Sequence, residues 1–292
     1  METLGSAKPP CAGSIPAPVS EMKRTAPIFI ILSVLYLVLC TPTVHAQTFD
    51  AKKAYSDYQY ELGIYQENYS DFQNTKTFYL SNPTLQLKED ARQKTLKMLK
   101  NRDNLMSIYL TAIRMQIVDS NGFNNDQKGT IFSKIDPEVS WYKSHMNNYL
   151  DTDQLVDLFN KSDESKSRYT TNTTPIIDES LFDVGLSQEI GLRMNHQEIY
   201  TNLKNYINSN VSEGKLKIDP FSLWFTDIDT TVQELQENEA SGSAKIQSLE
   251  TVNYGINSTY ESANQILSSS VTLLSQLNNY LTNIISSIRN QI

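Results

Sequence analysis

Two histidines, His145 and His196, are the residues after position 46 whose side chains most readily act as a general base or metal ligand near neutral pH. Neither stands in a metal-binding pattern, since the stretch NHQEIY around His196 is not H-E-x-x-H. A zinc site would need carboxylates from elsewhere in the chain, so we expect both histidines to be exposed on helices. Distant residues could still assemble a Ser–His–Asp triad, although no G-x-S-x-G stretch indicates one.

One segment, NNDQKGTI (124–131), resembles a calcium-binding loop. Asn124, Asp126 and Lys128 occupy its first three ligand positions. A lysine cannot coordinate calcium, and Ile135 stands where the closing glutamate of such a loop belongs. We therefore expect no metal here and interpret Asp126 as a helix cap.

Two stretches, KIDPEVSWY (134–142) and KIDPFSLWF (217–225), share their first four residues and end in a tryptophan followed by a second aromatic. Asp-Pro favours a helix start, because Asp accepts first-turn amide hydrogens and Pro has none to lose. The likeness does not extend on either side, so we interpret the two stretches as two helix N-termini. The functional alternative is an aromatic patch that binds a partner, formed by Trp141, Tyr142, Trp224 and Phe225.

The segments around these residues show helical periodicity. The first carries an aromatic row at steps of three and four: Tyr55, Tyr58, Leu62, Tyr65, Tyr69, Phe72 and Tyr79, with Lys76 as the polar member. Such a row fits the core of a bundle, with its hydroxyls reaching partners or the edge. A surface that stacks on carbohydrate is the alternative.

A turn at Ser81-Asn82-Pro83 separates this helix from a second one. The second seam consists of Leu96, Leu99, Met106, Leu110, Ile113 and Ile117, with Asp103 interrupting it. We expect this helix to end at Ser120-Asn121-Gly122, where Gly122 would supply a left-handed C-terminal residue. Two long helices with a short connection should pack antiparallel.

The C-terminal part has the most regular seam, which runs from Ile246 to Ile288 and predicts one long helix. Between these ends we expect helices over 152–170 and 176–209, a polar break at TTNTTP (170–175), and a helix from Pro220 onward. No strand pattern of useful length occurs. The predicted fold class is all-α, an elongated antiparallel helical bundle with coiled-coil-like heptad packing.

The N-terminal region has the three-part layout of a secretory signal: Lys23-Arg24, the apolar run 28–40, and small residues before Gln47. We expect residues 1–21 to be a non-native or disordered extension, residues 22–46 a signal peptide cleaved between Ala46 and Gln47, and residues 47–292 a single exported helical domain. An uncleaved anchor formed by residues 26–44 is the alternative. Leu37-Val38-Leu39 followed by Cys40 resembles a bacterial lipoprotein box, but that pattern has a small residue just before the cysteine and Leu39 is not small.

Composition limits the possible partners. The chain has 25 basic and 33 acidic residues, and both cysteines, Cys11 and Cys40, precede position 47. An exported domain without cysteine has no disulfide and no thiolate nucleophile. The basic residues are not clustered, so we expect neither nucleic acid nor anionic lipid as a partner, and a membrane only through an uncleaved N-terminal segment.

We expect no catalytic residue, no cofactor and no metal. The first functional hypothesis is a non-enzymatic exported bundle, secreted or at the cell surface, acting as an interaction or structural module. It would bind a protein or self-associate through its C-terminal helix. The second is a ligand-binding or sensor module with a pocket beside the Tyr-rich first helix, and an enzyme with scattered carboxylates ranks last.

Overall fold

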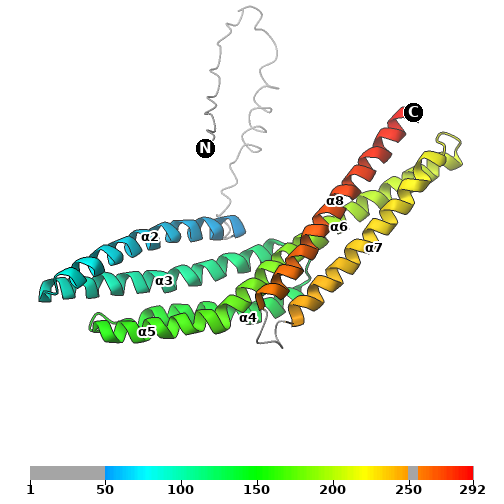
Figure 1. The fold of residues 1–292 in the computed structure, drawn as a ribbon. Helices are drawn as coiled ribbons and strands as arrows, with labels where there is room; N and C mark the ends of the chain where they lie inside the picture. The colour runs from blue at the N-terminus through cyan, green and yellow to red at the C-terminus, as the bar shows by residue number, and fades with distance from the viewer. Residues whose placement is uncertain (1–49, 249–255, 292) are drawn as a thin grey trace, which may run out of the picture. The chain divides into compact units, whose positions relative to one another are not determined.

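The computed structural model describes residues 50–248 and 256–291, and these are almost entirely helical (Figure 1). The elements are α2 (Ala51–Ser81), α3 (Leu85–Asp119), α4 (Asn125–Asn148), α5 (Leu155–Arg168), the π-helical turn η1 (Tyr169–Thr173), α6 (Thr174–Ser212), α7 (Asp219–Ser248) and α8 (Ile256–Gln291). These ranges contain no strand, so the predicted all-α bundle is confirmed. Residues 1–21, the signal segment 22–46 and the cleavage site at Ala46–Gln47 lie outside the described residues.

Neighbouring helices run antiparallel, as contacts between distant parts of the chain show. Lys94 on α3 pairs with Asp71 on α2 at 2.6 Å. At the other end of the two helices, the Ala51 amide donates to the carboxylate of Asp119 at 2.8 Å. The later part of α2 thus contacts the earlier part of α3, and the start of α2 contacts the end of α3, so the two helices run antiparallel. Heptad packing within these pairs stays a prediction.

The C-terminal helices form a second antiparallel pair. The Lys217 amide donates to Gln291 at 2.8 Å, and Asn238 donates to the Ser269 hydroxyl at 3.1 Å. The prediction of one continuous helix from Ile246 is wrong, because Ile246 belongs to α7 and packs in a cluster with α8 residues. A helical period continues in the sequence through a reversal of the chain, so the period alone could not reveal the reversal.

The core is divided into clusters that α6 connects. Ile177, near the start of α6, packs with residues of α3 and α4, including Ile135. Ile207, near its end, packs with α7 and α8 residues such as Phe221 and Leu277. The polar break predicted at 170–175 is wrong, because the chain passes through η1 directly into α6. Backbone bonds of a π-type turn keep this polar stretch helical.

One of the two predicted Asp-Pro helix starts is correct. α7 begins at Asp219, whereas Pro137 lies inside α4. α4 begins earlier at a reciprocal cap, in which Asn124 and Gln127 each bond the backbone of the other at 3.0 Å. Asp126 is therefore a first-turn residue rather than the cap. The stronger start upstream decides where the helix begins.

Gly122 follows the end of α3 for a different reason from the one predicted. Among the described glycines, only Gly214 has a positive φ, of 73°. A Cβ atom on Gly122 would lie 1.9 Å from the backbone oxygen of Ser187 on α6. Glycine is required because the turn between α3 and α4 packs directly on the backbone of α6.

The aromatic row of α2 is less buried than predicted. Only Ala54 and Asn68 are buried within this helix, and Tyr55 and Tyr69 are 48% and 43% exposed. The prediction that this row forms a core is thus wrong for these two tyrosines. Among the described helices, α2 packs mainly on α3, so part of its aromatic face remains open to solvent.

Candidate functional site

The predicted aromatic patch is divided between two parts of the structure. Trp141 packs against the cluster that contains the buried Tyr142, and Trp224 packs against a different cluster next to Phe225. Both tryptophans are half-buried, while Tyr142 is 2% and Phe225 9% exposed. The structure does not bring the two pairs together, and a role in partner binding stays a prediction.

The histidine expected to be exposed on α4 is buried. His145 is 2% exposed, and its Nδ1 lies 2.5 Å from Oδ2 of Asp103, which is fully buried on α3. Ser165 of α5 donates to the other oxygen of Asp103 at 3.0 Å. The Asp103 carboxylate therefore joins three helices. This site was not predicted from the sequence, although Asp103, which interrupts an apolar seam, was its signal.

This cluster does not have the geometry of a hydrolytic triad. A nucleophilic serine must bond to the histidine that takes its proton. Ser165 bonds instead to Asp103, and the Nε2 of His145 lies 3.7 Å from the exposed carboxylate of Glu164. Trp141 stacks on the imidazole at 4.5 Å between ring centres. The cluster therefore fixes the positions of α3, α4 and α5 relative to one another.

A second group of polar side chains links α4 to the end of α5 and to η1. Arg168 donates to the buried carboxylate of Glu138 at 2.5 Å, and Thr173 donates to it at 2.8 Å. The Tyr142 hydroxyl lies 2.9 Å from the Thr173 hydroxyl, and burial raises the pKa of Tyr142 to about 12. These groups are paired with one another, which indicates a structural role for them.

The described residues include no cluster of three or more His, Cys, Asp or Glu side chains arranged to hold a metal ion. His196 is half-buried, and its Nδ1 faces the Leu192 carbonyl at 2.7 Å. None of the helices within 50–248 and 256–291 has the length and apolar character needed to cross a membrane.

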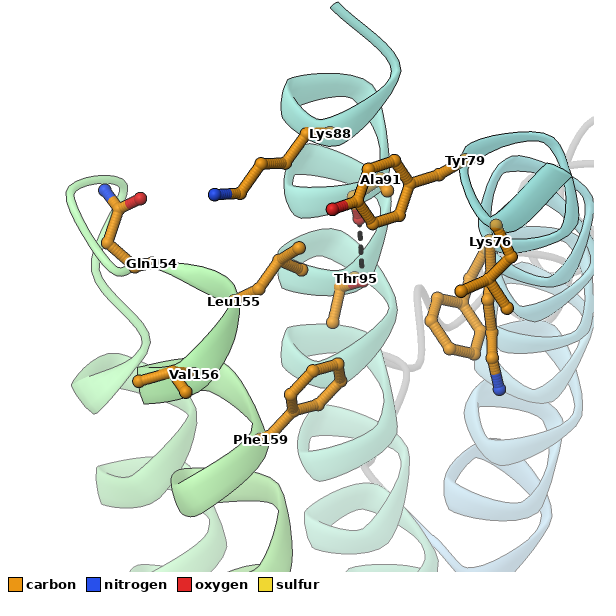
Figure 2. A pocket seen from close by; sticks show the side chains of 11 residues that line it. Lys76, Tyr79, Lys88, Ala91, Thr95, Gln154, Leu155, Val156 and Phe159 are labelled. Carbon is orange, nitrogen blue, oxygen red and sulfur yellow. Dashed lines mark hydrogen bonds between the residues drawn. The ribbon is translucent and has the colours of Figure 1, made fainter. Parts of the chain in front are cut away.

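The candidate site is an apolar groove between the last turns of α2, the first turns of α3 and the first turns of α5 (Figure 2). Its volume is about 550 Å³, which lies within the usual range of about 300–1,000 Å³ for ligand pockets. The groove is lined by Phe72, Lys76, Tyr79, Leu80, Lys88, Ala91, Thr95, Gln154, Leu155, Val156 and Phe159.

Small side chains on α3 give the groove its depth. Ala91 and Thr95 lie one turn apart and are 5% and 3% exposed. The Thr95 hydroxyl donates to the Ala91 carbonyl at 2.7 Å, so its hydrogen-bonding requirement is met within the helix (Figure 2). Aromatic and aliphatic side chains of α2 and α5 stand on either side of α3. The interior therefore favours an apolar occupant.

Two lysines supply the formal charge of the groove. Lys88 extends from α3 toward the start of α5, and Lys76 lies on the α2 side (Figure 2). Lys76 Nζ is 5.8 Å from the centre of the Phe72 ring. Within the described part of the chain, neither lysine forms an ion pair with an acidic side chain. Both ammonium groups can therefore receive an anion from outside the protein.

Arg92 holds the groove open by fixing the connection between α4 and α5. Its guanidinium donates to the backbone oxygens of Asp151 and Asp153 at 2.7 and 3.1 Å. It also pairs with Glu89 at 2.6 Å, and this contact lowers the pKa of Glu89 to about 2. The start of α5 is thereby held on one side of α3, while α2 packs on the other.

Comparison of the chain with protein-family models, with curated proteins and with solved structures found no match.

Proposed function

We propose that this protein is a non-enzymatic, exported ligand-binding module that holds a long-chain amphipathic anion of the alkyl carboxylate class in the groove between α2, α3 and α5. The observation that carries the proposal is a groove with an apolar interior and two lysines at its edge that have no acidic partner among the described residues. An alkyl chain would replace water along Phe72, Leu155 and Phe159. Its carboxylate would lie near Lys88.

The signal-like segment 22–46 supports the exported part of the proposal, since its layout is that of a secreted chain. The buried polar groups support the non-enzymatic part. Ser165 and His145 both bond to Asp103 and not to each other, an arrangement that does not activate the serine.

Self-association through the C-terminal helix stays a prediction. The apolar seam of α8 packs within the chain, because Ala263, Leu277, Leu281 and Ile284 are at most 5% exposed. A partner using that seam would have to replace α6 and α7. The open groove beside α2 requires no such rearrangement, so ligand binding is the function that the geometry supports better.

Calorimetric titration of the purified protein tests the proposal with two ligands of equal chain length and opposite charge, dodecanoate and dodecyltrimethylammonium, both below their micelle concentrations. Dodecanoate should bind at one site and the cation at least about fivefold more weakly, the effect of roughly 1 kcal/mol from a partly exposed ion pair. Equal binding of both, or of neither, would contradict the assignment.

Matched variants locate the binding. Val156 lines the groove and is 65% exposed, whereas Val271 on α8 is 64% exposed and lies outside it. Val156→Glu should weaken dodecanoate binding by about tenfold, because it places a negative charge beside the alkyl chain. Val271→Glu should leave it unchanged. Lys88→Gln should reduce the preference for the anion, and Lys52→Gln, an exposed lysine on α2, should not.

A further inference from the structure

Large apolar side chains gather at the end of the bundle where the groove opens. The end of α2, the first turns of α3 and the start of α5 lie at this end, because all three contribute to the groove lining. We call the following six residues, each more than half exposed, the apolar tip: Phe78, Leu80, Leu85, Leu150, Val156 and Phe159. Leu85 is the most open, at 87%. Exposed apolar groups gathered in this way indicate an interaction surface.

The acidic groups near the tip are engaged within the protein. Glu89 pairs with Arg92, Asp151 lies 3.5 Å from Lys100, and the Asp157 carboxylate accepts from the Gln154 amide at 2.9 Å. Lys76 and Lys88 have no such acidic partner among the described residues. Lys88, at the mouth of the groove beside the start of α5, can therefore pair with a phosphate of a lipid surface.

We propose that the apolar tip docks onto a lipid bilayer, so that the groove receives its amphipathic ligand from the membrane. This inference rests on the proposed function, because it names the source of the ligand. Leu80, Val156 and Phe159 belong both to the tip and to the groove lining. If the protein inserted into the bilayer as far as these shared residues, the mouth of the groove would lie at the depth where alkyl chains and headgroups meet.

The composition of the whole chain did not predict contact between this tip and a membrane. The chain as a whole is acidic, with a formal net charge of −8. Interfacial binding depends on the local apolar area together with nearby positive charge, not on the net charge of the chain. A second copy of the chain is the other possible occupant of the tip, and the experiment below identifies it.

Flotation with lipid vesicles tests the docking. The chain from Gln47 onward contains every described helix and lacks the apolar N-terminal segment, and cooperative thermal unfolding serves as the control that it folds. Vesicles of phosphatidylcholine alone and with 30% phosphatidylglycerol are compared at 0.15 M salt. The tip variant is Phe78→Glu with Leu85→Glu, two residues outside the groove lining. Leu223→Glu on α7 is the control, since Leu223 is 67% exposed.

The wild type and the Leu223→Glu variant should float with both vesicles, and more strongly with the anionic ones. The tip variant should lose at least about tenfold in binding while it still binds dodecanoate normally. Flotation that the tip variant retains would overturn the docking. The docking would also be overturned if the wild type forms a dimer that does not float, and if the substitutions of the tip variant dissociate that dimer.

The proposed function and the docking can fail separately. If dodecanoate binds but no chain floats, the docking is overturned and the ligand site stands. If the wild type floats through the tip but dodecanoate does not bind, the tip is an interfacial surface and the proposed ligand is wrong, together with the inference that the membrane supplies it.

Discussion

The Nδ1 of His145 lies 2.5 Å from Oδ2 of Asp103, and both side chains are buried at the junction of α3, α4 and α5. The same carboxylate accepts hydrogen bonds from Ser165 at 3.0 Å and from Arg102 at 3.1 Å. This group holds together α3, α4 and α5, and two of these helices, α3 and α5, line the groove. The pair is therefore a stability determinant for the site, although it lies outside the groove lining.

Replacing His145 with alanine should destabilise the protein by about 3–5 kcal/mol, because it removes one partner of a buried carboxylate. Urea unfolding measures the loss as a lower midpoint. The matched variant is His196→Ala on α6, which removes a half-buried imidazole and should cost less than about 1 kcal/mol. Equal effects of the two substitutions would show that the Asp103 contact contributes little.

Two glycines should respond in opposite ways to replacement by alanine. At Gly122 the new Cβ would lie 1.9 Å from the Ser187 oxygen, so Gly122→Ala should cost at least about 2 kcal/mol. At Gly63, inside α2, the Cβ would meet nothing within 4 Å. Gly63→Ala should therefore stabilise the protein by roughly 0.5–1 kcal/mol. Thermal unfolding of both variants checks this, and a stabilised Gly122→Ala would contradict the close packing of the turn on α6.

Stability should fall as the pH rises from about 4.5 to 7. Burial raises the pKa of the Glu189 carboxyl to about 7, and the nearby Glu239 carboxylate adds to the shift. Both Glu189 oxygens are buried, and the Ser270 hydroxyl beside them donates to the Ile266 carbonyl at 3.2 Å. The folded protein keeps a proton in this window that the unfolded chain releases, so each rise in pH favours unfolding. Well above pH 7 the Glu189 carboxyl is ionised in both the folded and the unfolded chain, so its effect on stability no longer changes with pH.

A second carboxyl acts in the same direction. Burial, with a contribution from Glu179, raises the pKa of Asp183 to about 7. Urea midpoints between pH 4 and 8 measure the combined slope. Glu189→Gln should flatten it and raise stability at pH 8, whereas Glu198→Gln, an exposed position on the same helix, should leave it unchanged. A slope that Glu189→Gln does not alter would contradict this assignment.

Affinity for alkyl carboxylates should grow with chain length until the groove is full. Each methylene buried from water contributes about 0.8 kcal/mol, or roughly a fourfold change in Kd. Titrations of the saturated carboxylates from C8 upward should show this increment and then a plateau. Val156→Glu should lower the increment for the methylenes that reach α5. An affinity that ignores chain length would indicate that only the carboxylate is recognised.

The all-helical class was predictable because apolar residues repeat at helical steps in every long segment. Chain reversals and helix starts were harder to predict. The period continues from Ile246 through the end of α7 into α8, and Pro137 sits inside α4 because Asn124 and Gln127 cap the helix upstream. Local patterns report which faces are apolar, while competition among caps and tertiary contacts decides where helices begin and end.

The site was predictable only in outline. The aromatic row of α2 indicated a pocket beside the first helix, but the walls on α3 and α5 come from residues far apart in sequence, such as Ala91 and Phe159. Only one feature of the sequence indicated the buried pair of Asp103 and His145, namely an acidic residue in an otherwise apolar seam. Its partner could not be chosen from sequence, because any polar residue on a facing helix would satisfy it.

Photolabelling tests the central claim most directly. A hexadecanoate analogue with a diazirine on its alkyl chain would be bound to the protein, irradiated and located by peptide mass spectrometry. The adducts should fall in residues 72–80, 88–95 and 154–159, and excess hexadecanoate should prevent them. Adducts spread over α6, α7 and α8, or adducts that hexadecanoate does not displace, would contradict a ligand site in the groove.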